Sequence, residues 1–230
     1  SKIFDPLLAF KEIALEIPTL DDRFVFMETN PDWQLIGVNA LAIASRVLKN
    51  YNPELSKECI AAAEDLYNRF KDEKRRGDYY WMSNQKLEAL IELVISTNKQ
   101  QYKDDLCAMS AQVKRSFMNA GWSMGRVLNY IDCKEFKDSV NAAAVLNKPV
   151  VEKMLAKSPY GSPMSNAEYV AFSAYYLNKF WPELYPVENL YNVINYMLGC
   201  RPGNTKNSLV SGVGVNSPTT AYGNNRADWS

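Results

Sequence analysis

Apolar residues recur every three or four positions along most of this chain, with polar residues between them. In residues 35–48 this spacing produces one broad apolar face, which is typical of an amphipathic helix. The face consists of Leu35, Ile36, Val38, Leu41, Ile43, Val47 and Leu48. The same spacing predicts further helices at about 53–70, 81–96, 101–118, 122–128, 134–157, 165–180 and 186–198. Since no long stretch alternates with a period of two, we do not expect a parallel α/β sheet.

Local signals mark where several of these helices begin and end. The run Asn52-Pro53-Glu54 provides a capping side chain, a proline in the first turn and an acidic residue near the helix N-terminus. Gly199 is placed to end the last helix. The charged run at 71–78 is predicted to be a solvated connection, and Pro149 is expected to kink or split its helix.

The helices follow one another in pairs joined by short loops, with roughly 35–50 residues per pair. Pairs of this length build either an open solenoid or an α/α toroid, in which an inner and an outer ring of helices close on themselves. No sequence signature is repeated from one pair to the next, which favours the toroid. We therefore predict an all-α fold of the (α/α) toroid type.

The amino-acid composition argues against several classes of partner and catalytic site. The 26 basic and 26 acidic residues give a formal net charge of zero, which does not favour nucleic acid or an acidic membrane surface as partner. The chain has no histidine, which removes the Ser-His-Asp triad and the common histidine metal sites. We expect no cofactor and no metal. No apolar run is long enough to span a membrane, and no signal peptide is visible.

The four cysteines, Cys59, Cys107, Cys133 and Cys200, lie far apart in the sequence and show no CxxC spacing. We therefore expect neither a disulfide framework nor a zinc site. Cysteines in helical segments commonly act as small apolar core residues. After Gly199 the sequence changes to a stretch with few charges and many Gly, Asn, Ser and Pro residues. Long loops of this kind often carry binding surfaces, and a loosely attached tail is the alternative.

Several motifs near the C-terminus resemble those of one enzyme family. Residues 195–203 (NYMLGCRPG) resemble a YxLGxNP segment, residues 208–214 (SLVSGVG) resemble an SFVTGFG run, and Ser217-Pro218 follows at the family spacing. Residues 222–226 (YGNNR) lie where many members have a His-His-Arg sugar-binding motif. Residues 21–26 and 40–47 are similar to the middle of the same domain. The chain thus resembles the catalytic domain of glycoside hydrolase family 9, in a Bacteroides-type subgroup.

The resemblance implies a toroid of six helical hairpins and inverting hydrolysis of O-glycosidic bonds in a β-glucan-type polysaccharide. Inversion needs a carboxylic acid and a carboxylate about 6.5–9.5 Å apart. The family's base belongs to a DAGD-type motif that this sequence lacks, and its acid is a Glu in the final hairpin, beyond Ser230. We therefore predict no catalytic residue in 1–230, which would be a partial catalytic domain, inactive alone, with hairpins at 1–199 and a cleft loop at 200–230.

Substrate-binding residues are predicted in that loop. The Arg226 guanidinium has five donors for sugar hydroxyls, Asn225 both donates and accepts, and the rings of Tyr222 and Trp229 can stack on sugar faces. Alternatively, Arg226 bonds loop carbonyls and fixes the loop. Tyr160, in a turn between helices, is a further cleft candidate.

The expected partners are a polysaccharide or oligosaccharide and the N- and C-terminal segments of the same domain. The resemblance implies a periplasmic or extracellular location. A non-catalytic helical-repeat binding module is one alternative function. A degenerate relative that binds glycans without cutting them is another, because Asn replaces both histidines of the motif.

Overall fold

A computed structural model describes residues 30–73, 84–156, 164–200 and 206–217. The chain divides into two units, Ser1–Asn30 and Pro31–Ser230, and all helices of the described ranges belong to the second. In chain order they are α2 (Pro31–Leu48), α3 (Pro53–Phe70), α4 (Gln85–Thr97), α5 (Gln100–Ala108), the 3-10 helix η2 (Ser110–Gln112), α6 (Val113–Val127), α7 (Lys134–Ala156), α8 (Met164–Phe180) and α9 (Glu188–Met197).

The prediction of an all-α fold is confirmed. Within the four described ranges the structure has no strand, and one isolated parallel bridge joins Asn207 to Asn216. None of the helices in these ranges is long and apolar enough to cross a membrane.

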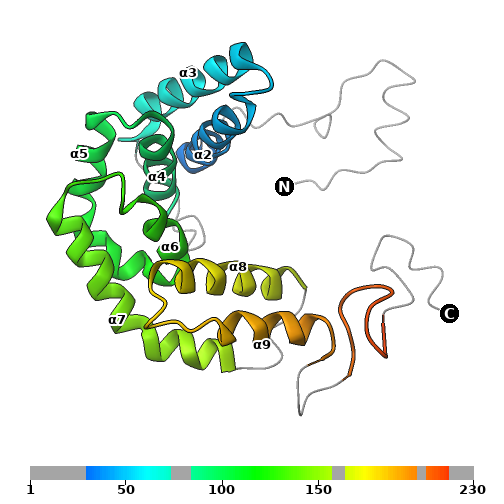
Figure 1. The fold of residues 1–230 in the computed structure, drawn as a ribbon. Helices are drawn as coiled ribbons and strands as arrows, with labels where there is room; N and C mark the ends of the chain where they lie inside the picture. The colour runs from blue at the N-terminus through cyan, green and yellow to red at the C-terminus, as the bar shows by residue number, and fades with distance from the viewer. Residues whose placement is uncertain (1–29, 74–83, 157–163, 201–205, 218–230) are drawn as a thin grey trace, which may run out of the picture. The chain divides into compact units, whose positions relative to one another are not determined.

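The helices of this unit form two rows (Figure 1). The first row consists of α2, α4, α6 and α8, each of which packs on the next. The second row consists of α3, α5, α7 and α9, and each of these packs on the first-row helix that precedes it in the chain. Every hairpin therefore places one helix in each row, which is the alternation expected of an α/α toroid.

Helix α4 lies within the core, where it packs on α2, α3, α5 and α6. The apolar residues Leu87, Leu90, Ile91 and Val94 of this helix are all buried, at the spacing expected of an amphipathic helix. On α2 the prediction is only partly right. Leu35 and Val38 are buried, but Ile43 and Val47 of the predicted apolar face are 38% and 63% exposed.

Two tyrosines connect the second-row helices α3 and α5. The Tyr67 hydroxyl donates to Asp105 at 2.9 Å, and the Tyr102 hydroxyl donates to Glu64 at 3.1 Å. The two rings meet edge to face, with their centroids 5.5 Å apart. Both hydroxyls therefore find acceptors at the helix surface while the rings fill the core, the usual arrangement for a buried tyrosine.

The predicted helix at 101–118 is interrupted. Helix α5 ends at Ala108, the single turn η2 follows, and α6 begins at Val113 and continues to Val127, so it includes the short helix expected at 122–128. The interruption is needed because the chain passes here from the second row to the first. The Ser110 hydroxyl donates to the Cys107 carbonyl at 2.5 Å and satisfies one of the groups left free at the helix end.

Pro149 does not split its helix, since α7 runs unbroken from Lys134 to Ala156. A proline removes the hydrogen bond to the carbonyl four residues earlier, here that of Val145. Val145 is 59% exposed, so this carbonyl lies on the side of the helix where water can bond to it. The loss is therefore tolerated.

The prediction of no disulfide is wrong. Cys107, near the end of α5, is bonded to Cys133, directly before α7, with a Cα–Cα distance of 5.9 Å. The partners are 26 residues apart in sequence, and they meet because α5 and α7 are neighbours in the second row. Cys59 is a free buried cysteine, as expected, and Cys200 is free and exposed.

Residues 206–217 return to the end of α9. Gly199 ends the helix region with φ of 71°, as predicted. The Leu209 amide donates to the Met197 carbonyl at 2.7 Å, and the Ser208 amide donates to the Asn216 carbonyl at 2.9 Å. Gly214, with φ of 83°, packs where a Cβ atom would come within 2.8 Å of the Leu198 carbonyl oxygen. This part of the loop is thus docked on α9.

Candidate functional site on the first-row helices

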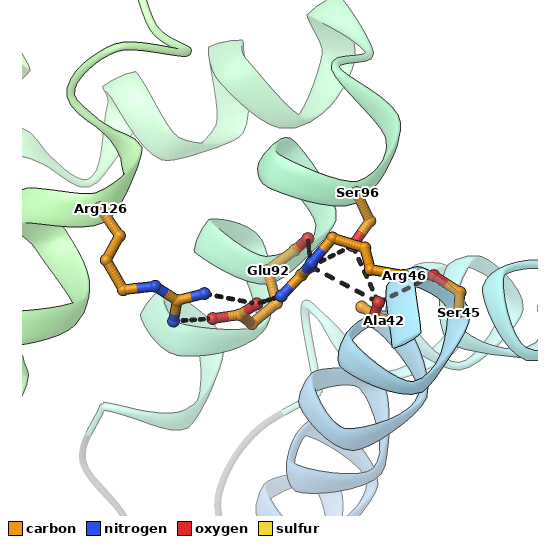
Figure 2. A network of polar contacts seen from close by, with 6 residues as sticks. All are labelled: Ala42, Ser45, Arg46, Glu92, Ser96 and Arg126. Atoms are coloured by element: carbon orange, nitrogen blue, oxygen red, sulfur yellow. Dashed lines mark hydrogen bonds and ion pairs between the residues drawn. The ribbon is translucent and has the colours of Figure 1, made fainter. Parts of the chain in front are cut away.

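A buried carboxylate connects three helices of the first row. Glu92 of α4 is 1% exposed, and it forms ion pairs with Arg46 of α2 and Arg126 of α6 (Figure 2). Arg126 donates from both terminal nitrogens to the two oxygens of Glu92. A buried carboxylate is costly unless cations and donors surround it, and the two guanidinium groups provide both.

Arg46 is fixed by further contacts between α2 and α4. Its Nη1 donates to the Glu92 carbonyl oxygen at 3.3 Å and to the Ser96 hydroxyl. The hydroxyls of Ser96 and Ser45 both donate to the Ala42 carbonyl, at 2.9 and 2.8 Å (Figure 2). The Arg46 guanidinium thus holds α2 against α4, together with the hydrogen bond from Ser96 to the Ala42 carbonyl.

An aromatic face lies beside this network on α6 and α8. Trp122 of α6 packs against Phe172 and Tyr176 of α8, with ring centroids 4.8 and 5.8 Å apart. The Arg126 guanidinium lies over the Trp122 ring, 5.8 Å from its centroid. We define the aromatic face as Trp122, Tyr169, Phe172, Tyr175 and Tyr176.

Part of the aromatic face is open to solvent. Tyr169, Phe172 and Tyr175 are 44%, 44% and 46% exposed. Lys179 also belongs to this surface, with its ammonium group 5.8 Å from the ring centroids of Tyr175 and Tyr176. Exposed rings next to cations can stack on flat apolar ligand surfaces, such as the faces of sugar rings.

The contacts between α6 and α8 show that the two helices run in the same direction. Asn119 accepts a hydrogen bond from the Tyr169 hydroxyl at 2.7 Å through its carbonyl oxygen. Trp122 meets Phe172, and a Cβ atom on Gly125 would come within 2.2 Å of the Phe180 ring. Residue numbers thus increase together along both helices, and Gly125 allows their close approach.

Glu88 lies one turn before Glu92 on α4 and is only partly buried. Burial and the charge of Glu92 raise the pKa of Glu88 to about 7. Burial also raises the pKa of the Tyr169 hydroxyl, and the charge of Glu88 adds to this effect. Glu88 and Tyr169 are thus coupled electrostatically, although they come from the different helices α4 and α8.

Two pockets of the described residues differ in their position relative to the aromatic face. A cavity of about 20 Å³ lies between α6 and α8, lined among others by Gly121, Trp122 and Ser173. It has room for about one water molecule. A larger pocket of about 290 Å³ lies in the second row beside the disulfide. Its charged lining residues are one lysine, Lys103, and two aspartates, Asp104 and Asp132, and it contains no aromatic ring on which a sugar could stack.

The site residues predicted from the sequence lie outside the described residues. This applies to Tyr160, Tyr222, Asn225, Arg226 and Trp229, so the structure does not test these predictions. In the described part of the chain, no group of three His, Cys, Asp or Glu side chains could hold a metal ion.

Sequence reasoning missed the Glu92 network and the aromatic face. The sequence did contain a signal for the Glu92 network, because Glu88 and Glu92 interrupt the otherwise apolar run 87–95. Buried carboxylates on such a helix require cations from its neighbours. The aromatic face was visible as rings at positions 169, 172 and 176, a spacing that equally fits a helical core.

Comparison with known proteins gives one family. The model of glycosyl hydrolase family 9 matches residues 26–227. None of the curated proteins compared with the chain matches it.

The structure resembles solved endoglucanases. The crystal structure of GH family 9 endoglucanase J30 is similar with a TM-score of 0.58 and 17% sequence identity, over 80% of this chain and 39% of that chain. A Zn-binding triple mutant of that enzyme gives a TM-score of 0.58 and 16% identity over the same shares. The chain therefore spans 39% of the length of these neighbours. The likeness confirms the predicted fold, that of the (α/α)6 barrel, in place of an open solenoid.

Proposed function

The chain belongs to glycosyl hydrolase family 9, and from this premise we propose that it forms part of a glycoside hydrolase that cleaves O-glycosidic bonds of a β-glucan-type polysaccharide with inversion. The family match over 26–227 carries the proposal. The similarity to structures described as endoglucanases agrees with it. On this view residues 1–230 are a partial catalytic domain of a Bacteroides-type subgroup, with hairpins up to residue 199 and a cleft loop at 200–230.

The first row supplies the substrate-facing surface in this proposal. The aromatic face offers exposed rings on α8 and a tryptophan held by Arg126 on α6. When a sugar ring stacks on such a side chain, its apolar C–H surface is buried while its hydroxyl groups stay hydrated. The loop residues Tyr222, Asn225, Arg226 and Trp229, together with Tyr160, would add hydrogen bonds and further rings.

The catalytic pair is proposed to lie outside this chain. General acid and base catalysis each contribute about 10²–10⁴-fold to the rate, so the 230-residue chain is expected to bind glycan without cutting it. Incubation of the purified chain with a soluble mixed-linkage β-glucan, followed by measurement of new reducing ends against a buffer blank, tests this. Turnover that follows the protein through purification would place a catalytic pair within residues 1–230.

Binding is the second arm of this test. We expect the chain to be retarded in native gels that contain the β-glucan, and Trp122→Ala to reduce this retardation. Retardation without turnover is also the behaviour of a degenerate glycan-binding relative. The two are separated by adding the family's DAGD-type and final-hairpin segments, which restores turnover in an enzyme and leaves a degenerate relative inactive.

The Cys107–Cys133 disulfide supports an extracellular or periplasmic location. Disulfides persist in oxidising compartments and are rare where glutathione and thioredoxin keep thiols reduced. We propose that the protein acts there on polysaccharide outside the cell. Mass spectrometry of the protein from its native compartment would find the bond intact, and two free thiols would contradict the proposal.

A further inference from the structure

We infer that the cavity between α6 and α8 binds one water molecule, which bridges the indole N–H of Trp122 and the hydroxyl of Ser173 and thereby fixes the Trp122 ring in the aromatic face. The inference concerns how this face is built, and it does not depend on the proposed function. It starts from two polar groups that line the same cavity.

Two buried polar atoms lack a hydrogen-bond partner from the protein. They are the indole nitrogen of Trp122 on α6 and the hydroxyl oxygen of Ser173 on α8, and neither bonds to another described residue. The Ser173 residue as a whole is 8% exposed. A polar group that loses its hydration without gaining a bond destabilises the fold, so such groups nearly always bond to protein atoms or to ordered water.

The cavity has the size of one water molecule. Its volume is about 20 Å³, and a single water needs about 10–15 Å³ of such space. Its lining comes from α6, α7 and α8, and the polar groups in it belong to Trp122, Tyr169 and Ser173. The space is too small for a sugar or a polyatomic anion. A metal cation is disfavoured as well, because the indole of Trp122 offers only a donor.

The three polar groups match the bonding capacity of a water molecule. The Tyr169 hydroxyl already donates its hydrogen to the Asn119 carbonyl oxygen at 2.7 Å, so towards the cavity its oxygen can only accept. A water can accept from Trp122 and Ser173 and donate to Tyr169, which makes the three bonds usual for a buried water. Burial raises the pKa of the Tyr169 hydroxyl, and the polar groups of Ser173 and Trp122 act in the opposite direction, in agreement with their proximity.

The bridging water completes the support of the Trp122 ring. Phe172 meets this ring edge to face with centroids 4.8 Å apart, and the Arg126 guanidinium lies 5.8 Å from its centroid. These contacts act on the ring as a whole and do not select a direction for its N–H. A hydrogen bond to a water held by α8 does, so Ser173 fixes the orientation of the indole from beneath the aromatic face.

Urea unfolding of the full chain tests the inference with Ser173→Ala, Trp122→Phe and the double variant. Each single substitution removes one partner of the water, so each should lower the urea midpoint. In the double variant the water has lost two of its three partners, and the second substitution should shift the midpoint by about half or less of its effect alone. If the Ser173 hydroxyl had no water, its removal would raise the midpoint, because an unbonded buried group is deleted.

Ser45→Ala is the matched control. Ser45 is also a buried first-row serine, but its hydroxyl donates to the Ala42 carbonyl at 2.8 Å. Its effect on the midpoint should simply add to that of Trp122→Phe, because the two sites share no partner.

A high-resolution crystal structure locates the water directly. We expect one peak of electron density within hydrogen-bond distance of Trp122 Nε1 and Ser173 Oγ. A cavity without density, a raised midpoint in Ser173→Ala, or additive effects of Ser173→Ala and Trp122→Phe would each overturn the inference. No glycan is used in these measurements, so their outcome is independent of whether the proposed function holds.

Discussion

Glu88 and Glu92 are chemically identical and only one helical turn apart, yet their surroundings differ. Glu92 is paired with two arginines, while Glu88 meets the Glu92 charge and partial burial, which raise its pKa to about 7. The Glu92 carboxylate therefore still raises the pKa of Glu88, although Glu92 itself is paired with two arginines. Among the described residues, the cations that pair with Glu92 come from the neighbouring helices α2 and α6.

The raised pKa of Glu88 predicts a loss of stability with increasing pH. The folded protein holds a proton at about pH 7, whereas the unfolded chain releases it near 4.5. The stabilising contribution is complete below pH 4.5 and disappears as pH rises through 7, at about 1.4 kcal/mol per pKa unit, or up to about 3 kcal/mol in total. Urea unfolding at about pH 5 and about pH 8 measures it.

Glu88→Gln should abolish most of this pH dependence, because the amide resembles the protonated acid. Glu58→Gln should leave it as in the wild type, since that side chain is exposed on α3. An unchanged pH dependence in Glu88→Gln would mean that the carboxyl group is ionised in the folded protein.

Arg226 is the residue for which the sequence makes the sharpest binding prediction. In the intact enzyme, Arg226→Ala is expected to weaken oligosaccharide binding by about 1–3 kcal/mol, the usual effect of losing hydrogen bonds to a charged group. Helix content, followed by circular dichroism, should hardly change. Equal affinity of the variant and the wild type would assign Arg226 to fixing the loop.

At the scale of helices, apolar spacing predicted most elements but not the crossing between rows. Helix α3 begins after Asn52, whose side chain accepts from the Leu55 amide at 3.1 Å, as the local signal indicated. The break at 109–112 could not be predicted, because residues 101–118 keep a helical spacing throughout. Helix α5 ends because the chain passes here from the second row to the first. The position of this crossing depends on the packing of α6 against α7 and α8, which follow later in the sequence.

The candidate site was less predictable than the helices for the same reason. Arg46 and Glu92 are 46 residues apart in sequence, and Arg126 lies a further 34 residues on. Helical periodicity identifies which face of a helix is buried, but it does not reveal which neighbour faces a given charge. The register between first-row helices decides that.

Helix packing between α6 and α8 should be sensitive to one added methyl group. A Cβ atom on Gly125 would come within 2.2 Å of the Phe180 ring, and overpacking of this kind typically costs about 1–3 kcal/mol. Gly125→Ala is therefore expected to lower the free energy of unfolding, as measured by urea denaturation.

Gly37→Ala provides the matched control. There the added Cβ would meet Leu66 at 3.7 Å, an ordinary contact. Replacing a helical glycine with alanine should then stabilise the protein by about 0.5–1 kcal/mol. If both alanine variants were stabilising, the close approach of α6 and α8 would be disproved.

For the molecule as a whole, the disulfide closes a loop that contains all of α6, since it joins Cys107 to Cys133. In the chain-entropy model, a loop of 26 residues corresponds to about 3.5 kcal/mol of stabilisation. The double variant Cys107→Ser/Cys133→Ser should lose about this much in urea unfolding, and reduction of the wild type should have the same effect.

Cys200→Ser serves as control, since Cys200 is free and exposed and its replacement should change stability by less than about 0.5 kcal/mol. Wild-type stability in the double serine variant would show that the loop is already restrained in the unfolded chain.

The Glu92 network also has a consequence for how the structure opens. Since one carboxylate joins α2, α4 and α6, these helices cannot separate individually without exposing an unpaired buried charge. Native-state hydrogen exchange should therefore show their amides opening as one cooperative unit with a common free energy. In Glu92→Gln the amides of α2 should exchange faster than those of α4, while α9, which lies far from the network in sequence and in packing order, keeps its own rate. If the amides of α2 opened separately in the wild type, the cooperative unit would be disproved, and the first-row helices would open one at a time.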